Sequence, residues 1–304
     1  MELEPVREWR IHLGAHKTAT THLQDTIFLR RAFLRKMGID YIPMRDVRAL
    51  KLPPRPGRLQ WRTRLGWPMR ARLEDAIAPL RSGPGRVVIS DENLLGWVRD
   101  LLAVPFYPNM EARLRPFHAL CKARNVSLFL GLRNPATLLP SAYAQQLRVR
   151  PVPGGFEPIC NLALRSSASW FDVVSRLRKT LPDASLTIWK FEDYKDMQWH
   201  ILSQIVGTYI SPGETLPPSA STRSPSWDAI EAIERIPEHA SSEQHAELAA
   251  QIIENDLGAT KFDPVSHADK ERFEDLYQKE LENIARTYPE IRFLAPEFAH
   301  PTET

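Results

Sequence analysis

The sequence has 304 residues, of which 43% are hydrophobic and 25% are charged. This balance is typical of a globular protein and excludes a disordered or fibrous chain. No window approaches the roughly 18 apolar residues that a membrane-spanning helix needs, and residues 1–10 lack the apolar region of a signal peptide. We therefore expect a cytoplasmic protein, in which Cys121 and Cys160 are buried thiols rather than a disulfide or zinc framework.

The net charge of +3 conceals an asymmetry along the chain. Residues 30–86 contain 15 lysines and arginines against 4 acidic residues, whereas residues 226–304 contain 7 against 18. The electric field of a basic or an acidic segment can raise the rate at which the protein meets a partner of opposite charge. The alternative is that the two segments neutralise each other or form solvated faces. We expect no nucleic acid as a partner, and the oligomeric state cannot be predicted.

Apolar segments with strand character alternate with helical ones along the first two thirds of the chain. Predicted strands lie at 9–13, 39–43, 86–90, 126–132 and 185–191. Helical spacing predicts helices at 20–37, 109–124 and 135–148, the first of them stopped by Gly38. Strands separated by helices of this length favour a parallel sheet with helices on both faces. The predicted class is therefore α/β.

The chain is expected to divide into two parts. Residues 1–225 form the α/β unit, and residues 226–304 form an acidic helical extension packed on it. Within the first part, residues 51–68 are rich in proline, arginine and tryptophan and are predicted to be a loop. This loop could bind a polyanion or a sugar, or it could be a disordered surface insertion; the sequence leaves both open.

The most informative stretch is the strand, loop and helix at 9–34. A loop that starts at Gly14 and leads into a helix aims backbone N–H groups and the positive end of the helix dipole at one point, which favours a phosphate. Lys17 adds a formal charge there, and hydroxyls follow at Thr18, Thr20 and Thr21. The spacing is not that of the P-loop motif G-x-x-x-x-G-K-[ST], because Gly14 precedes Lys17 by only three residues.

The segment 11–24 resembles the 5′-phosphosulfate-binding loop of the PAPS-dependent sulfotransferases, whose family form is close to K-T-G-T-T-x-L. The matching positions are Lys17, Thr18, Thr20, Thr21 and Leu23, and Ala19 stands at the glycine. If that position needs a positive φ, Ala19 is strained. If it already lies within the helix, alanine is favourable there.

A second segment, 128–148, resembles the 3′-phosphate-binding element of the same family. Arg133 precedes Asn-Pro, and Ser141 follows eight residues later on the ensuing helix. A guanidinium at a strand end can bind phosphate bidentately, and a hydroxyl can complete the site. The alternative is a surface ion pair and an ordinary helical serine. Weaker matches lie at 189–195 and 221–230, and the latter implies a nucleotide contact by Arg223.

This resemblance implies a P-loop-type fold and transfer of a sulfuryl group from PAPS to a hydroxyl or amine of a small-molecule or glycan acceptor. It implies cofactor contacts by Gly14, Lys17, Thr18, Ala19, Thr20, Thr21, Arg133, Ser141 and Arg223. Lys17 would meet the charge that develops on the bridging oxygen, by analogy with phosphoryl transfer. No metal is expected. The content of Trp and Arg at 55–72 favours a carbohydrate or glycoconjugate acceptor.

Two residues are candidates for the base. Glu92 follows the strand at 86–90, at the carboxyl edge where ligands bind in open α/β sheets; the alternative is that it only starts a helix. His16 lies beside Lys17, and an imidazole titrates near neutrality; its alternative is to orient the loop. The sequence does not choose between them.

Two other functions stay open. In a P-loop kinase or ATPase, the segment 86–92 would be an apolar strand ending in acidic residues, and Thr18 would bind magnesium. In a binding module, the sheet would hold a nucleotide while the stretch 55–72 gripped an anionic polymer without turnover. Selectivity among 3′-phosphoadenosine 5′-phosphate (PAP), ATP with magnesium, and AMP separates these functions.

Overall fold

The computed structural model describes residues 6–49, 75, 77–83, 85–166, 168–212, 224–237 and 239–296. The loop predicted at 51–68 and the wider stretch 55–72 therefore lie outside the described residues, as does Arg223.

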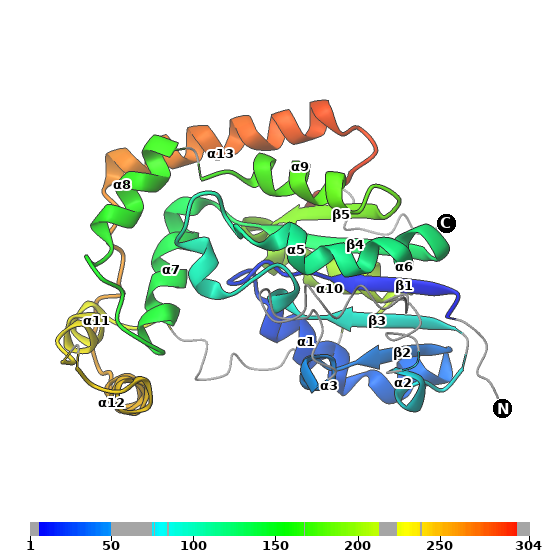
Figure 1. The fold of residues 1–304 in the computed structure, drawn as a ribbon, viewed down its shortest axis with the longest axis horizontal. Coiled ribbons are helices and arrows are strands. Elements are labelled where there is room, and N and C mark those ends of the chain that lie inside the picture. The colour runs from blue at the N-terminus through cyan, green and yellow to red at the C-terminus, as the bar shows by residue number, and fades with distance from the viewer. Residues whose placement is uncertain are drawn as a thin grey trace, which may run out of the picture.

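A six-stranded sheet in the order β2-β3-β1-β4-β5-β6 forms the centre of the molecule, and every pairing in it is parallel (Figure 1). Its strands are β1 (Glu8–His12), β2 (Ile39–Ile42), β3 (Arg86–Ser90), β4 (Asn125–Leu132), β5 (Ser185–Lys190) and β6 (Arg292–Leu294). The first five agree with the predicted segments to within one residue at each end. The α/β class is confirmed.

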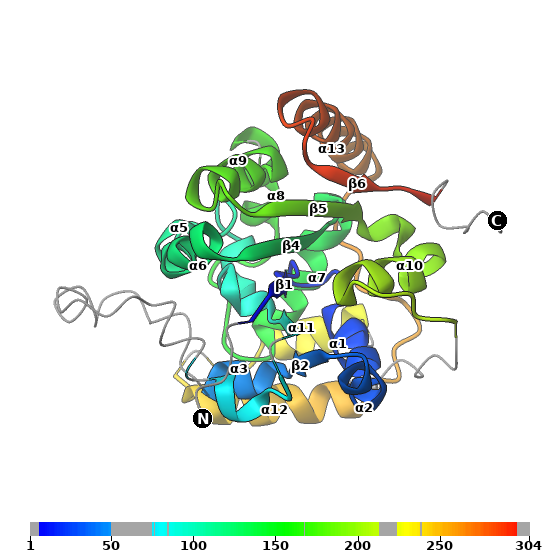
Figure 2. The ribbon, with the colours of Figure 1, turned by 90° about the vertical axis from the view of Figure 1, so that its right-hand side faces the viewer.

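Helices cover both faces of the sheet (Figure 2). Alternation along the strands explains this: Val87 and Ile89 belong to one apolar cluster, and Val88 between them belongs to another on the opposite face. The helices are α1 (Thr20–Leu29), α2 (Arg31–Lys36), α3 (Met44–Ala49), α5 (Met110–Leu114), α6 (His118–Ala123), α7 (Pro135–Leu147), α8 (Glu157–Ser166), α9 (Trp170–Thr180), α10 (Tyr194–Val206), α11 (Trp227–Glu234), α12 (Ser242–Glu254) and α13 (His267–Thr287). None of these described helices is long and apolar enough to cross a membrane.

The helix predicted at 20–37 is two helices, because the chain breaks at Arg30, where φ is −92° and ψ is 3°. Its stop at Gly38 is confirmed, since that glycine has a φ of +73°. The helix predicted at 109–124 is likewise divided, into α5 and α6 joined by a short 3₁₀ turn. Cys121 and Cys160 are both free and buried, as expected.

The C-terminal segment is mainly helical, as its composition suggests, but it is not purely so. The long helix α13 packs against α7 and α9, and the chain then enters the sheet as β6, which pairs with β5 through Arg292–Leu294. The acidic segment thus completes one edge of the sheet.

The strand order places a topological switch at β1. From β1 the chain passes to β2 at one edge and returns through β3, whose connection to β4 then crosses to the other side of β1. In open α/β sheets, ligands bind at the carboxyl ends of the strands beside such a point. The loop after β1, Glu92 after β3 and Arg133 after β4 all lie at this edge.

Candidate functional site

The loop that follows β1 is tied to β4 by backbone hydrogen bonds. Ala15 donates its N–H to the Gly131 carbonyl at 3.2 Å, and Gly131 donates its own N–H to the Gly14 carbonyl at 2.6 Å. Gly14 has a φ of +97°, and a Cβ there would lie 2.8 Å from the Glu92 Cβ. Glycine is therefore required at this position both by conformation and by the close approach to Glu92.

Thr18 and Ala19 have structural roles that the sequence does not reveal. Thr18 is fully buried, and its hydroxyl donates to the Ala15 carbonyl at 2.7 Å, so it is already engaged in holding the loop. Ala19 has a φ of 62° and stands immediately before α1. Ala19 thus adopts the strained left-handed conformation and does not lie within the helix. Thr20 is buried, and Thr21 is exposed.

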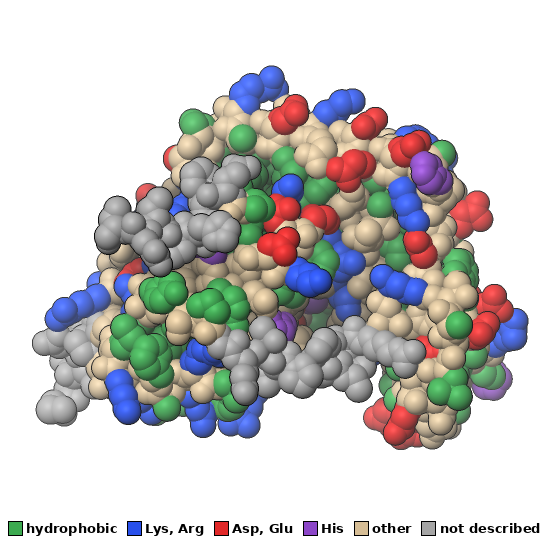
Figure 3. Space-filling model, turned by 180° about the vertical axis from the view of Figure 1, so that it is seen from behind, with side chains coloured by type: hydrophobic (Ala, Val, Ile, Leu, Met, Phe, Trp, Pro, Cys, Tyr) green, Lys and Arg blue, Asp and Glu red, His purple; other side chains and the backbone are tan. Residues whose placement is uncertain are grey.

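A cavity of about 660 Å³, here called the basic cavity, brings the two phosphate-binding candidates together. Lys17 and Thr21 from the first motif line it, and so do Arg133 and Ser141 from the second. Its ionisable lining residues are Lys17, Arg133, Arg148, Lys261, Lys270 and Asp263, five cations and one anion. Lys270 is paired with Asp263 at 2.6 Å. Seen from behind, the molecule has a hollow near its middle, with both basic and acidic side chains around it (Figure 3).

Lys17 is a cation without a carboxylate partner. Its ammonium group makes no hydrogen bond or ion pair with any other residue that the structure describes. Burial, together with the charges of Arg148 and Arg133, lowers the pKa of Lys17 to about 8. An anion in the basic cavity would offset this repulsion, so the arrangement favours an anionic ligand.

Arg133 joins the two motifs. Its Nη1 donates to the Lys17 carbonyl at 2.7 Å, and its Nε donates to Thr137 Oγ1 at 3.0 Å. Its guanidinium carbon lies 4.3 Å from the centre of the Phe191 ring. Burial lowers the pKa of Arg133 to about 10, which the nearby Glu192 opposes, but the group stays charged at neutral pH. Arg133 thus fixes the loop as well as lining the basic cavity.

A second cavity of about 760 Å³, here called the polar cavity, adjoins the basic one. The two share Gln145 and Val149 as lining residues. Both base candidates, His16 and Glu92, line the polar cavity. Lys17 and its neighbour His16 therefore contribute to different but adjoining cavities.

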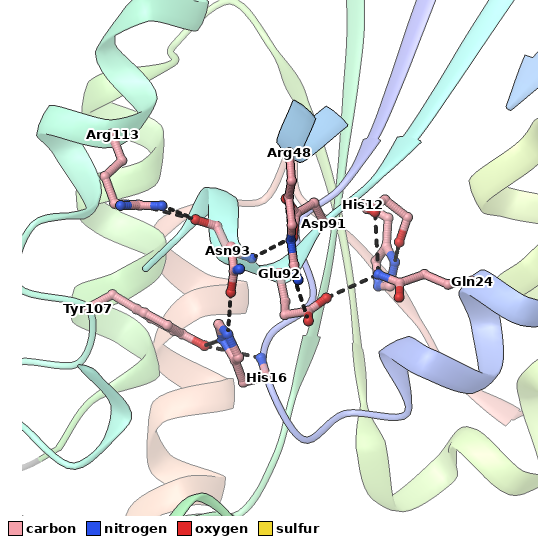
Figure 4. A network of polar contacts seen from close by, with 10 residues as sticks. His12, His16, Gln24, Arg48, Asp91, Glu92, Asn93, Tyr107 and Arg113 are labelled. Atoms are coloured by element: carbon pink, nitrogen blue, oxygen red, sulfur yellow. Dashed lines mark hydrogen bonds and ion pairs between the residues drawn. The ribbon is translucent and has the colours of Figure 1, made fainter. Parts of the chain in front are cut away.

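Glu92 is held in a defined orientation (Figure 4). Gln24 Nε2 donates to Glu92 Oε2 at 3.0 Å, and Arg48 Nη2 lies 3.3 Å from Glu92 Oε1. The side chain keeps 17% of its surface exposed. The carboxylate is thus oriented but still reachable from the polar cavity.

Both ring nitrogens of His16 are engaged (Figure 4). Nδ1 lies 3.0 Å from the Tyr107 hydroxyl, and Asn93, in the amide orientation that satisfies its neighbours, donates to Nε2 at 3.1 Å. Burial lowers the pKa of His16 to about 4, so the ring is neutral near pH 7. These contacts fix the ring against the loop.

Asp91 forms an ion pair with Arg48, a residue that the sequence does not indicate as part of the site. Arg48, from α3, contacts its carboxylate through Nη2 at 2.7 Å and Nε at 3.2 Å. Burial raises the pKa of Asp91, with Arg48 opposing the rise. A magnesium-binding acid of a kinase would need this carboxylate free. Within the described residues, no group of three or more His, Cys, Asp or Glu side chains could hold a metal ion.

The comparisons with known proteins are sparse. No family model matches the sequence, and no curated protein matches it. Among solved structures, the chain is similar to retinol dehydratase, determined in complex with androsterone and the inactive cofactor PAP. The two are 14% identical, the match covers 97% of this chain and 84% of that one, and the TM-score is 0.32. A likeness this weak carries no functional conclusion, so the function is argued from the site.

Proposed function

We propose that this chain is a PAPS-dependent sulfotransferase that transfers a sulfuryl group to a hydroxyl of a carbohydrate-type acceptor. One observation carries the proposal: Lys17, Thr21, Arg133 and Ser141, which come from two separate motifs, line a single basic cavity. Four cations beyond the Lys270–Asp263 pair give that cavity the charge to hold a doubly phosphorylated nucleotide.

The donor is bound in the basic cavity. Arg133 and Ser141 contact its 3′-phosphate, and the start of α1, with Lys17, holds the 5′-phosphosulfate. Gly14 and Ala19 shape the loop, the buried Thr18 and Thr20 support it, and Thr21 offers its hydroxyl to the ligand. Arg223, which lies outside the described residues, is kept as a candidate contact because its neighbours Ser224 and Pro225 line the same cavity.

The acceptor is bound in the polar cavity. Its hydroxyl oxygen forms a bond to sulfur while the bond between sulfur and the bridging 5′-phosphate oxygen breaks, and PAP leaves with the electron pair. The hydroxyl proton passes to Glu92, and Lys17 stabilises the negative charge on the leaving oxygen. We assign His16 a positioning role, because both of its ring nitrogens are engaged with Tyr107 and Asn93. The scheme uses no metal.

Transfer of labelled sulfate from PAPS to a panel of sugars, glycosides, phenols and amines tests this function. Lys17→Ala is expected to abolish transfer. Glu92→Gln should lower the rate by about 10²–10⁴-fold while PAP affinity stays unchanged. Lys36→Ala, an exposed lysine outside both cavities, is the matched control and should behave as the unmodified protein.

Other outcomes would point elsewhere. Tighter binding of ATP with magnesium than of PAP would favour a kinase or ATPase. Binding of PAP without transfer to any acceptor class would favour a non-catalytic nucleotide-binding module. Full activity of Glu92→Gln would leave His16 as the base to test.

A further inference from the structure

The polar cavity contains polar groups that the proposed transfer does not use. Gln146 lines it and is only 7% exposed, and within the described part of the chain its side-chain amide has no hydrogen-bond partner. The Gln146 amide is not among the buried polar atoms that lack a partner, so it meets the solvent of the cavity and is available to a polar ligand there.

Arg113, from α5, is a second such group. It is 5% exposed and lines the same cavity. Its Nε donates to the Asn93 carbonyl at 3.2 Å, its Nη2 donates to the same carbonyl, and its guanidinium carbon lies 5.4 Å from the centre of the Trp97 ring. It forms no ion pair with a carboxylate of any described residue. Burial lowers the pKa of Arg113, and the charges of Asp100 and Asp91 offset only part of that effect, so an anion in direct contact would stabilise the guanidinium further.

The charges around the cavity leave a surplus of cations. Four arginines line it, Arg48, Arg99, Arg113 and Arg150, against two acids, Glu92 and Asp100. Arg48 is paired with Glu92 at 3.3 Å and also with Asp91 at 2.7 Å, and Asp100 lies 3.8 Å from Arg99. Arg113 and Arg150 form no close ion pair with a carboxylate of any described residue, although Asp100 and Asp91 act on Arg113 from a greater distance.

We propose that the acceptor carries an anionic group, a carboxylate or a sulfate ester, which Arg113 and Arg150 bind while Gln146 contacts a neutral hydroxyl. This inference rests on the proposed function, because it names the acceptor class of the same site. A planar guanidinium binds a carboxylate or a sulfate through two parallel hydrogen bonds. The acceptor is thus an acidic sugar, and not a neutral one.

Three probes that differ in one group test this inference: phenyl β-glucoside, phenyl β-glucuronide and phenyl β-glucoside 6-sulfate. Their affinities are measured by calorimetry with the full chain saturated with PAP. We expect at least one of the two acidic probes to bind about tenfold or more tightly than the glucoside, and the preference to shrink as salt is raised. Comparison of the two acidic probes identifies which anion is preferred. Equal affinity for all three, or no binding of any, overturns the inference.

Arg150→Gln is the informative variant, because Arg150 is exposed and holds no other described element in place. It should reduce the preference for the acidic probe severalfold without changing the thermal unfolding midpoint. Arg286→Gln, which removes an exposed arginine outside both cavities, is the matched control and should keep the full preference. An undiminished preference in Arg150→Gln would contradict the assignment.

Binding of PAP is measured in the same titrations without the acidic probes. If PAP binds but the probes are not discriminated, the acceptor inference fails and the sulfotransferase proposal stands. If PAP does not bind, the sulfotransferase proposal fails first.

Discussion

Ala19 adopts a left-handed backbone conformation, with a φ of 62° and a ψ of 24°, directly before α1. For a residue with a Cβ this conformation costs about 1–2 kcal/mol. Lys17, two positions earlier, also has a positive φ, of 65°. Strain of this kind clusters at ligand-binding sites. The loop therefore keeps a shape that suits a ligand at some cost in stability.

Ala19→Gly should relieve part of that strain. Glycine adopts the left-handed conformation without a steric penalty, although its more flexible unfolded state offsets part of the gain. We expect the free energy of unfolding to rise by about 0.5–1 kcal/mol, measured by urea denaturation. Ala32→Gly, at an exposed position of α2, is the control and should lower it by about 1 kcal/mol. A lower free energy of unfolding in Ala19→Gly would contradict the claim that Ala19 is strained.

The pKa of Lys17, near 8, predicts a pH dependence of donor binding. The ammonium is charged below this pKa and attracts phosphate, and it becomes neutral above it. Affinity for PAP should therefore fall by about tenfold between pH 7 and pH 9. In Lys17→Arg the charge persists, so the affinity measured by calorimetry should change little over the same range. An equal fall in both proteins would assign the titration to another group.

At the scale of the element, Asn134 connects α7 to the rest of the site. Its Oδ1 accepts from the Ala136 N–H at 2.8 Å and caps the helix that carries Ser141, and its Nδ2 donates to Glu274 of α13 at 2.6 Å. One side chain thus provides both the cap of α7 and a hydrogen bond to α13.

Asn134→Ala should lower the free energy of unfolding by about 1–2 kcal/mol, because it removes the cap and leaves Glu274 without this donor. Thermal or urea unfolding measures the change. Asn109→Ala is the matched control: Asn109 precedes α5 but makes no side-chain capping bond, so its loss should be below about 0.5 kcal/mol. If both variants lowered the free energy of unfolding equally, the Asn134 cap would contribute nothing to stability.

Elements with a strong local pattern could be predicted from the sequence, and elements that depend on distant contacts could not. The five strands were predictable because each is an apolar run between turn or helix signals. The strand β6 has three residues, too few for any periodicity, and exists because β5 offers an unpaired edge. The break at Arg30 has no proline or glycine to announce it.

The candidate site divides in the same way. Sequence motifs indicate Lys17 and Arg133. The hydrogen bond from the Arg133 guanidinium to the Lys17 carbonyl, however, forms only in the folded chain. The contact of Arg48 with Asp91, the engagement of the Thr18 hydroxyl and the ring contacts of His16 all join side chains whose geometry no spacing encodes. The residues of the site were thus predictable from the sequence, but the contacts and the role of each residue were not.

At the scale of the whole molecule, the parallel sheet brings the ends of β1, β3 and β4 to one edge, where the basic and polar cavities adjoin. Residues separated by more than a hundred positions, Lys17 and Arg133, thereby share one cavity. The C-terminal segment contributes Lys261 and Lys270 to it. Because Lys270 is paired with Asp263 of the same segment, the net charge that this acidic segment adds to the basic cavity is that of Lys261.

The central claim is that Lys17 and Arg133 bind opposite ends of one doubly phosphorylated nucleotide. Calorimetric affinities for PAP and AMP, measured for the unmodified protein, Arg133→Ala and Ser141→Ala, test it most directly. We predict that PAP binds more tightly than AMP and that Ser141→Ala weakens PAP while leaving AMP nearly unchanged. Arg133→Ala should weaken PAP more than AMP, because Arg133 also holds the loop that carries Lys17. Equal weakening of PAP and AMP, or no preference for PAP in the unmodified protein, would contradict the claim.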